Sequence, residues 1–324
     1  MTTICLAPLQ GTTDRIFRNL FPQYFHGVDY AIAPFVSATG KLKPDFPGLF
    51  ELSPDRNQGL PTVPQIMGTQ PENFVLIANR LFEMGCAVIN WNLGCPFRMV
   101  VKKGRGAGML CYPDRIESFL DRVMPQLKPN LSVKLRIGLK DPDDALALIP
   151  IFNRYPLEEL IIHPRTGAQM YEGKVDLDRF EQCLSLSKHR VVYNGDIVSP
   201  QNLEALARRF LFVNRWMIGR GLMENPFLAE EIKAFPPRSF QEKVHVLKAF
   251  HDHLFAEYSA VLSGPGHKVN KMKEIWTFMT GFFENRDKVR KMIHKTHSPD
   301  HYLGVVQQIF DQALSRPGAT YFPD

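Results

Sequence analysis

Cys95 is the residue of this sequence best suited to transfer a proton. It lies in the segment Gly94-Cys95-Pro96, where the flanking glycine and proline predict a turn at the end of a strand. A thiol in such a turn can act as a nucleophile or as a general acid, because its ordinary pKa of about 8.5 leaves it mostly protonated at neutral pH. The alternative is a small buried apolar side chain, which is how we interpret most of the other cysteines.

Lys134 interrupts an apolar run that predicts a buried strand, Val133-Lys134-Leu135. An unpaired ammonium inside a protein is costly, so a lysine here needs an anionic or electron-rich partner. The amine could form a Schiff base with a carbonyl substrate. It could also lie against the pyrimidine edge of a flavin and stabilise the reduced, anionic ring. A structural ion pair is the remaining alternative.

Two glycine-containing segments have the composition of a phosphate-binding site. They are Asn194-Gly195-Asp196 and Gly219-Arg220-Gly221. Glycine allows backbone N–H groups to approach a phosphate, and the loops after the seventh and eighth strands of a barrel commonly bind one. Each segment alone is more typical of an ordinary tight turn, but the pair favours phosphate.

Further polar side chains lie on predicted strands or directly after them, near the strand ends where α/β barrels have their active sites. They are Gln10, Gln65, Asn92, Arg136, His163 and Arg165. His163 could bind a cofactor or could be an ordinary core histidine. The glycine-rich run 104–108 has the spacing of neither a P-loop nor a dinucleotide fingerprint. The five cysteines include no CxxC pair, so we expect no metal site.

The elements that must position these residues alternate between strand and helix. Eight β-rich runs, most of them almost continuously apolar, lie at residues 4–7, 30–35, 63–67, 87–91, 132–137, 159–163, 191–194 and 215–218. Helical patterns lie at 72–84, 113–127, 143–154, 176–187, 200–208 and 226–233. These alternations predict an α/β fold of the (β/α)8 TIM-barrel class. A doubly wound sheet is the alternative, because periodicity does not show closure.

The amino-acid composition of the chain changes after the prolines at 236 and 237, which predict a linker. The segment that follows has no convincing strand, and helical spacing covers residues 241–262, 268–283, 284–295 and 299–314. We therefore expect a small C-terminal all-α helical bundle. This divides the chain into a catalytic barrel, residues 1–237, and a helical domain, residues 238–324.

Positive charge is concentrated in the helical domain. The chain has 39 lysine and arginine residues against 33 aspartate and glutamate residues, a formal net charge of +6. Residues 268–295 contain eight of these cations and three of the anions, and so carry most of that charge. Lysines on the outer face of a helix, such as Lys268, Lys271 and Lys273, could follow a phosphate backbone. A solvated helix face is the commoner explanation of such a run.

Composition excludes several classes of protein. With 44% apolar and 22% charged residues, the chain is globular and neither disordered nor fibrous. Five cysteines in 324 residues do not make a disulfide scaffold. We find no apolar run long enough to span a membrane and no secretory signal pattern. We expect a cytoplasmic monomer without a membrane or metal partner.

In combination these residues resemble the tRNA-dihydrouridine synthases. The likeness follows the barrel in order, through residues 7–14, 92–96, 104–110, 132–136, 163–166, 194–196 and 217–221. It continues into residues 268–283, which look like the basic, tryptophan-bearing helix of the family's C-terminal domain. The asparagine–x–glycine–cysteine–proline motif, with the later lysine and histidine, is its most specific part.

The resemblance implies a function and a role for each site residue. It implies FMN at the barrel mouth, NADPH as the reductant, and a D-loop uridine of tRNA that receives hydride at C6 from FMN. Catalytic Cys95 would protonate C5, giving 5,6-dihydrouridine, and the base must be flipped out of the tRNA to reach the site. The residues implied for FMN are Pro8, Leu9, Gln10, Gln65, Lys134, His163, Asn194, Gly195, Asp196, Gly219 and Arg220. Those implied for the uridine or the tRNA are Asn92, Arg98, Arg136, Arg165, Tyr171, Lys268, Lys271 and Lys273.

Within the family, residues 163–166 and Tyr171 most resemble the bacterial branch that acts on position sixteen of the D-loop. Ser37 stands where that branch carries an arginine, so the modified position stays open. Leu9 replaces the usual methionine, and Arg98 stands where the family often has lysine, which keeps a basic group there.

Three other functions use the same residues. A flavin oxidoreductase of free pyrimidines, of the dihydroorotate type, shares the barrel but has no use for a basic helical tail. A Schiff-base aldolase would use Lys134, and an RNA-binding module would need no catalytic cysteine. A visible spectrum of the purified protein separates the flavin-dependent functions from the other two.

Overall fold

Ten short parallel strands form a single sheet in the computed structural model, which describes residues 2–39 and 47–315 of the chain. The sheet order is β3-β5-β6-β7-β8-β9-β10-β1-β2-β4. Strands β1, β6, β7, β8, β9 and β10 comprise Thr3–Leu6, Val88–Leu93, Asn130–Arg136, Leu157–His163, Val191–Tyr193 and Arg215–Ile218. All six overlap strands that the sequence predicts.

The other four strands close this sheet into a barrel. β2 (Tyr30–Ile32) lies within one predicted strand, and β3 (Val36–Ser37) follows directly after the predicted end of that strand at residue 35. β4 (Thr62–Val63) and β5 (Gln65–Met67) overlap the next predicted strand. Each interruption contains a proline, which cannot donate a backbone hydrogen bond. β2 pairs with β4, and β3 pairs with β5. The strand order begins with β3 and β5 and ends with β2 and β4. Since β2 continues into β3 and β4 continues into β5, the two ends of the sheet meet. The (β/α)8 barrel is therefore confirmed, and the doubly wound alternative is wrong.

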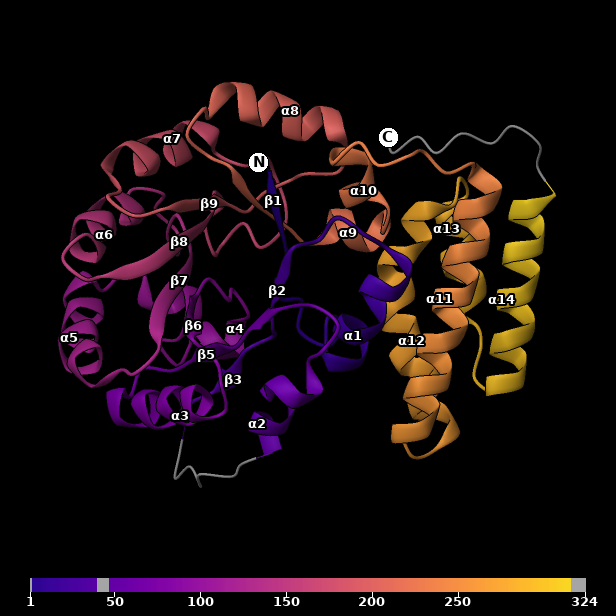
Figure 1. Cartoon of the computed structure of the whole chain (residues 1–324), viewed down its shortest axis with the longest axis horizontal. Helices are drawn as coiled ribbons and strands as arrows, with labels where there is room; N and C mark the ends of the chain where they lie inside the picture. Colours follow the sequence, from indigo (N-terminus) through magenta and orange to yellow (C-terminus); the bar gives the residue numbers. More distant parts are fainter. Residues whose placement is uncertain (1, 40–46, 316–324) are drawn as a thin grey trace.

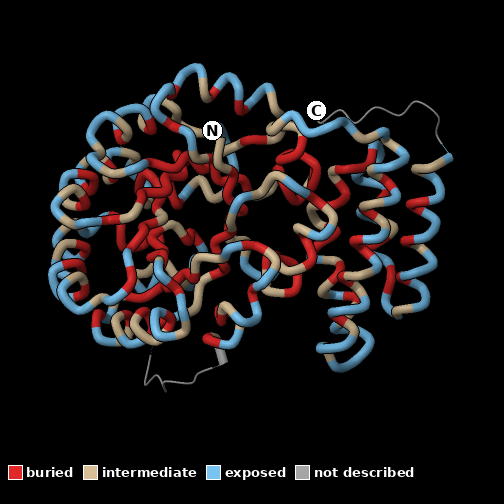
Figure 2. The backbone as a smooth tube through the Cα atoms, viewed as in Figure 1, coloured by how far each residue is buried: buried red, intermediate tan, exposed pale blue. Residues whose placement is uncertain are grey.

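The predicted barrel helices pack around the outside of the sheet (Figure 1). α3, α5, α6, α7, α8 and α10 comprise Pro71–Glu83, Pro113–Val123, Asp144–Phe152, Leu177–Leu186, Pro200–Arg209 and Leu228–Ile232. Short 3-10 turns η1, η2, η3 and η4 comprise Pro54–Arg56, Gly106–Met109, Met124–Gln126 and Thr280–Phe282. Buried residues lie inside the barrel and on the inner faces of the helices (Figure 2). Within the described ranges, no helix is both long and apolar enough to cross a lipid bilayer.

The sequence pattern misses four helices of the described residues. α1, α2, α4 and α9 comprise Arg15–Tyr24, Pro47–Leu52, Arg98–Val101 and Arg220–Glu224. α1 contains Pro22, which argues against a helix in a sequence reading. The other three have four to six residues, too few for a periodicity to show. Gly219 is the N-cap of α9, so the segment 219–221, for which the sequence offers a tight turn or a phosphate-binding loop, begins a short helix.

The C-terminal helices form the predicted bundle beside the barrel (Figure 1). α11, α12, α13 and α14 comprise Phe240–Val261, Pro265–Met279, Arg286–His294 and Pro299–Leu314. Phe250 of α11 packs its ring against Phe17 and Phe21 of α1, with ring centroids 5.7 and 6.2 Å apart. Barrel and bundle therefore share one continuous apolar core, and removing the bundle would expose these rings to water.

A buried hydrogen-bonded network inside the bundle connects α11, α12 and α14. The His251 ring lies 2.5 Å from Tyr302 Oη through Nε2 and 2.9 Å from Asp252 Oδ1 through Nδ1. Trp276 Nε1 donates to Tyr302 Oη over 2.8 Å. Burial lowers the pKa of His251, so the folded bundle holds this ring in its neutral form.

We expect His251 to make folding stability depend on pH. Its pKa in the folded protein lies below the value of about 6.5 for an unfolded chain, so at acidic pH the unfolded state binds a proton that the folded state does not. Stability then falls with decreasing pH, by at most about 1.4 kcal/mol per pH unit. Glutamine does not titrate, so the melting temperature of His251→Gln should fall less than that of the wild type between about pH 7 and about pH 5.5. Equal falls in the two proteins would contradict this role.

Candidate functional site

A cavity of about 320 Å³ opens at the carboxyl ends of the barrel strands, where this fold has its active sites. Most of the predicted site residues line it: Pro8, Leu9, Gln10, Gln65, Asn92, Cys95, Lys134, Arg136, His163, Tyr171, Asn194, Gly195, Asp196, Gly219 and Arg220. The cavity lining does not include Arg98, Arg165, Lys268, Lys271 or Lys273. Barrel closure thus brings together side chains from loops that lie far apart in the sequence.

Two side chains of the barrel hold the turn that carries Cys95. Asn92 Oδ1 accepts hydrogen bonds from the backbone N–H of Gly94 over 3.1 Å and of Cys95 over 2.9 Å. Arg136 Nε donates to the carbonyl of Gly94 over 3.1 Å. The cysteine is only 7% exposed, yet it lines the cavity. Asn92 and Arg136 therefore orient the cysteine turn, a role that the sequence does not reveal.

A row of side-chain amides behind this turn orients Gln65. Asn92 Nδ2 donates to Gln65 Oε1 over 2.8 Å, and Gln65 Nε2 donates to Asn90 Oδ1 over 2.7 Å. Asn90 Nδ2 in turn donates to Ser132 Oγ over 2.7 Å. The row crosses β5, β6 and β7, and it is buried. Sequence reasoning missed Asn90, although its position two residues before Asn92 places both on one face of a strand.

Gly106, the first residue of η2, packs directly against Cys95. The Ala107 N–H donates to the Cys95 carbonyl over 3.0 Å. A Cβ on Gly106 would lie 2.6 Å from that carbonyl oxygen and 2.9 Å from the Cys95 Cβ, and the φ angle of Gly106 is +54°. The glycine-rich run 104–108 therefore shapes the cysteine turn from behind.

Gly106→Ala should displace Cys95, and Gly104→Ala provides a matched control. Both glycines have positive φ angles, +54° and +64°, but a Cβ on Gly104 would meet nothing within 4 Å. Each variant carries the strain of a left-handed alanine, about 1–2 kcal/mol, while only Gly106→Ala adds the contact with Cys95. A displacement of about 1 Å can lower a rate about 10²-fold. We therefore expect the rate of the catalysed reaction to fall about 10²-fold in Gly106→Ala alone. Equal rates in the two variants would argue against this contact.

The thiol of Cys95 is protonated at neutral pH. Burial raises its pKa above the ordinary value, and this outweighs the opposite effect of the charges on Arg136 and Lys134. A cysteine that acts as a nucleophile needs a lowered pKa. The environment of Cys95 therefore suits a proton donor, which must hold its proton until the reaction takes it.

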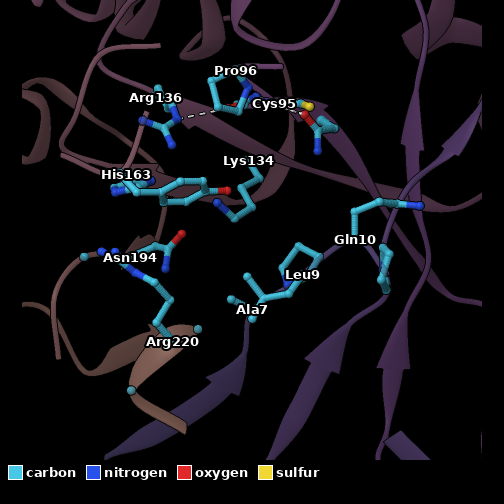
Figure 3. Close-up of a pocket in the computed structure, with 18 of the residues that line it drawn as sticks. Ala7, Leu9, Gln10, Cys95, Pro96, Lys134, Arg136, His163, Asn194 and Arg220 are labelled. Atoms are coloured by element: carbon cyan, nitrogen blue, oxygen red, sulfur yellow. Dashed lines mark hydrogen bonds between the residues drawn. The ribbon is translucent and has the colours of Figure 1, made fainter. Parts of the chain in front are cut away.

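Lys134 reaches into the cavity between the cysteine turn on one side and Leu9 and Gln10 on the other (Figure 3). Burial, with a smaller contribution from the charge of Arg136, lowers its pKa to about 7. Burial also lowers the pKa of His163, so this imidazole is neutral at neutral pH. A ligand that places negative charge beside Lys134 would raise its pKa again.

The two predicted phosphate-binding segments lie together at the cavity. Asp196 accepts from Arg165 over 3.0 and 2.5 Å and from Arg220 over 3.1 Å. A Cβ on Gly195 or Gly221 would lie 2.2 or 2.0 Å from a neighbouring oxygen atom, so packing within the loops requires these glycines. Gly219 has more room, since its Cβ would be 3.3 Å from the nearest atom. The glycine backbone of these two segments and the guanidinium of Arg220 fit an anionic group at this side of the cavity.

Tyr171 connects the cysteine side of the cavity with the arginine side. Its ring centroid lies 5.3 Å from the guanidinium carbon of Arg136 and 5.3 Å from that of Arg220. The side chain is 41% exposed and lines the cavity. An aromatic ring in this position can stack on a planar ligand.

Three cations predicted to contact tRNA have partners inside the protein. Arg165 is buried and donates to Asp196. Lys271 Nζ lies 2.6 Å from Asp14 Oδ2, and Lys273 donates to two backbone carbonyls at the C-terminal end of α13. This corrects the expectation that these lysines face outward, because helical spacing shows which residues share a face but not what packs against it.

Two of the predicted cations, and an aromatic residue that the sequence reasoning overlooked, lie outside the set of predicted residues that line the cavity. Arg98 is exposed at the start of α4, and Phe97, directly before it, lines the cavity while remaining 48% exposed. The position of Phe97 directly after the cysteine motif could have identified it.

Lys268 is half-buried near the start of α12. Additional lining residues are Ala7, Pro34, Phe35, Gly94, Pro96, Ile197, Val198, Gly221 and Glu224. Among the described residues, no group of three or more His, Cys, Asp or Glu could hold a metal ion.

The cavity has the donor set that a flavin needs. Pro8, Leu9 and Ala7 give it an apolar wall, the amide of Gln65 and the groups of Lys134 and His163 lie along it, and the cationic Arg220 lies at the glycine loops. A flat ring with hydrogen-bonding edges and an anionic tail matches these groups in kind. The residues present therefore fit the predicted cofactor.

Comparison with known proteins finds relatives along nearly the whole chain. The dihydrouridine synthase (Dus) family model matches residues 5–314. The tRNA-dihydrouridine synthase B of Vibrio cholerae is 26% identical over 320 residues, which cover 96% of this chain and 97% of the relative. That of Pasteurella multocida is 30% identical over 230 residues, 69% of this chain and 67% of the relative. The tRNA-dihydrouridine(16) synthase of Pseudomonas putida is 27% identical over 291 residues, 86% and 88% of the two chains.

Solved structures support the fold. Morphinone reductase in complex with tetrahydroNAD superimposes with a TM-score of 0.51 at 11% sequence identity, over 74% of this chain and 89% of that chain. At this identity the likeness concerns the barrel architecture alone.

Proposed function

Because the chain belongs to the dihydrouridine synthase family of oxidoreductases, we propose that it reduces a uridine in the tRNA D-loop to 5,6-dihydrouridine, with FMN as its cofactor and NADPH as the reductant. The observation that carries this proposal is the protonated thiol of Cys95, which lines the same cavity as the amine of Lys134 (Figure 3). The names of the relatives, tRNA-dihydrouridine synthases, support tRNA as the substrate.

FMN would be held by three groups of residues. Pro8, Leu9 and Gln10 would lie along the ring, and Gln65, Lys134 and His163 would bond to its edge. The phosphate end would be held by Asn194, Gly195, Asp196, Gly219 and Arg220. When bound, FMN supplies the hydride that C6 of the uracil receives.

Cys95 completes the reduction by giving its proton to C5. The Sγ–H bond breaks as the C5–H bond forms, and the electron pair stays on sulfur. The positive charges of Arg136 and Lys134 favour the thiolate that remains, since both act to lower the pKa of this thiol. Arg136 and Tyr171 also lie where they can contact the uracil, while Asn92 acts by orienting the cysteine turn.

The tRNA backbone contacts basic residues beside the cavity mouth. Arg98, Lys102 and Lys103 are exposed in and directly after α4, the helix that follows the cavity-lining Phe97, and the half-buried Lys268 adds charge from the bundle. Position 16 of the D-loop is the first candidate for the modified uridine. Two observations support it: the likeness of residues 163–166 and Tyr171 to the branch that acts there, and the Pseudomonas putida relative that is named for this position. The barrel, residues 1–237, performs catalysis and the helical domain, residues 238–324, binds tRNA, in a monomer that acts in the cytoplasm.

Spectroscopy and an activity assay test this function. The purified protein should show the visible spectrum of bound flavin, and with NADPH it should form dihydrouridine in tRNA transcribed without modifications. Sequencing the reduced sites in that tRNA, and in tRNA from a knockout strain, identifies the position. A colourless protein that binds no added FMN would overturn the proposal. Faster reduction of free uracil or orotate than of tRNA would favour a flavin oxidoreductase of free pyrimidines.

A further inference from the structure

α12 of the bundle touches the loop that follows β1, the loop whose residues Pro8, Leu9 and Gln10 line the cavity. Lys271 Nζ donates to the carbonyl of Gly11 over 2.6 Å and lies 2.6 Å from Asp14 Oδ2. A single side chain of the bundle therefore binds the last residue of this loop segment and the N-cap of α1 together.

Other contacts of the bundle enclose this ammonium. Tyr258 of α11 donates its hydroxyl to Asp14 Oδ1 over 2.8 Å, and its ring centroid lies 4.8 Å from Lys271 Nζ. Lys271 is only 15% exposed. Removing this ammonium would take away the cationic partner of the Asp14 carboxylate, which would keep its hydrogen bonds from Tyr258 and from the N–H of Phe17. Lys271 therefore has the geometry of a fixed tether.

Contacts within the loop and contacts with the bundle together shape the loop after β1. The N–H groups of Thr12 and Thr13 both donate to the carbonyl of Leu9 over 3.0 Å. Gly11 has a φ angle of +79°, and a Cβ there would lie 3.3 Å from Glu274 Oε2 of α12, so the bundle approaches the loop closely. Inside the loop, the Leu9 N–H donates to Thr13 Oγ1 over 2.9 Å, and on the barrel side the Ala7 N–H donates to the carbonyl of Ile218 over 2.9 Å. The segment 8–11 is thus held at one end by the barrel and at the other by α12.

We propose that Lys271 is a positioning residue for the cofactor: it fixes the β1–α1 loop in the conformation that receives FMN, so that the helical domain contributes to the cofactor site without touching it. This inference rests on the function proposed above. It assigns Lys271 to the cofactor site and not to the RNA surface.

Lys243 provides a matched control elsewhere on the same interface. Lys243 of α11 lies 2.6 Å from Glu231 Oε1 of α10 and is 16% exposed, and its Nζ is 5.5 Å from the ring centroid of Phe227. The two lysines therefore make ion pairs of equal length between bundle and barrel, each beside an aromatic ring. Only Lys271 contacts the loop that lines the cavity.

The test compares FMN dissociation constants of Lys271→Met, Lys271→Arg and Lys243→Met, measured by flavin fluorescence on the full chain without RNA. We expect about a tenfold weaker FMN affinity in Lys271→Met, recovery of most of the affinity in Lys271→Arg, and less than about a twofold change in Lys243→Met. Melting temperatures should fall similarly in both methionine variants, which separates positioning from general stability. Should Lys271→Met not fold, Tyr258→Phe, which removes one hydrogen bond to Asp14, should weaken FMN binding to a smaller extent.

Two results would overturn the inference. Equal FMN affinities of Lys271→Met and Lys243→Met, with only tRNA binding reduced in the former, would make Lys271 an RNA contact. Absence of FMN binding by the wild-type protein would remove the proposed function itself, and this inference with it.

Discussion

Cys95→Ala should lower the rate of dihydrouridine formation about 10²–10⁴-fold, the usual contribution of a general acid. The variant loses the only group that the proposal uses to protonate C5. It keeps the residues assigned to FMN, since the Cys95 side chain is not among them. We therefore expect normal flavin content and normal NADPH oxidation with an artificial electron acceptor. Product formation in tRNA is measured by nucleoside mass spectrometry.

Cys111→Ala is the control for this experiment. Cys111 is exposed on the segment that follows η2, and it does not line the cavity. Its removal should leave flavin content and both activities unchanged. Dihydrouridine formation by Cys95→Ala at the wild-type rate would remove the thiol from the mechanism. Loss of bound flavin in that variant would instead show that the cysteine turn supports the cofactor site.

Lys134→Met should weaken FMN binding at least about tenfold and abolish its pH dependence. The pKa of Lys134 in the cavity is about 7, so its charge is present below that pH and is lost above it. FMN that binds beside an ammonium must draw in a proton at higher pH, so wild-type affinity should fall by up to about tenfold per pH unit between about pH 7.5 and about pH 9. The methionine variant has no amine to protonate, so its dissociation constant should be constant across this range.

Lys134→Arg separates charge from titration. Arginine stays charged throughout this range, so its FMN affinity should also be independent of pH. The neighbouring titratable groups do not interfere, because burial lowers the pKa of His163 and raises that of Cys95. An identical pH dependence in the wild type and in Lys134→Met would mean that another group is responsible.

Most of the residues that line the cavity were predictable because a parallel barrel has a simple geometry. Side chains at the carboxyl ends of all its strands meet at one mouth, so the order of strands in the sequence was enough to bring Cys95, Lys134 and His163 together. Apolar runs showed the strands, and the flanking glycines and prolines showed where they end.

The supporting contacts were not predictable in the same way. The family resemblance implies a substrate contact for Asn92, and the structure adds that its carboxamide oxygen accepts hydrogen bonds from the backbone of the cysteine turn. The function of Gly106 became visible only when the space behind Cys95 was known. Both residues act on a neighbour in space, and spacing along a chain carries no information about such a neighbour.

The amino-acid sequence by itself determined the alternation of strands and helices, the motif around Cys95 and the basic composition of the tail, because these depend on local pattern and residue type. Only the tertiary structure decided that the sheet closes and that Lys271 binds the β1–α1 loop. It also decided that the cysteine is buried enough to keep its proton. Closure, pairing and burial arise between segments that are distant in the chain, and their energies depend on distances that exist only once the chain has folded.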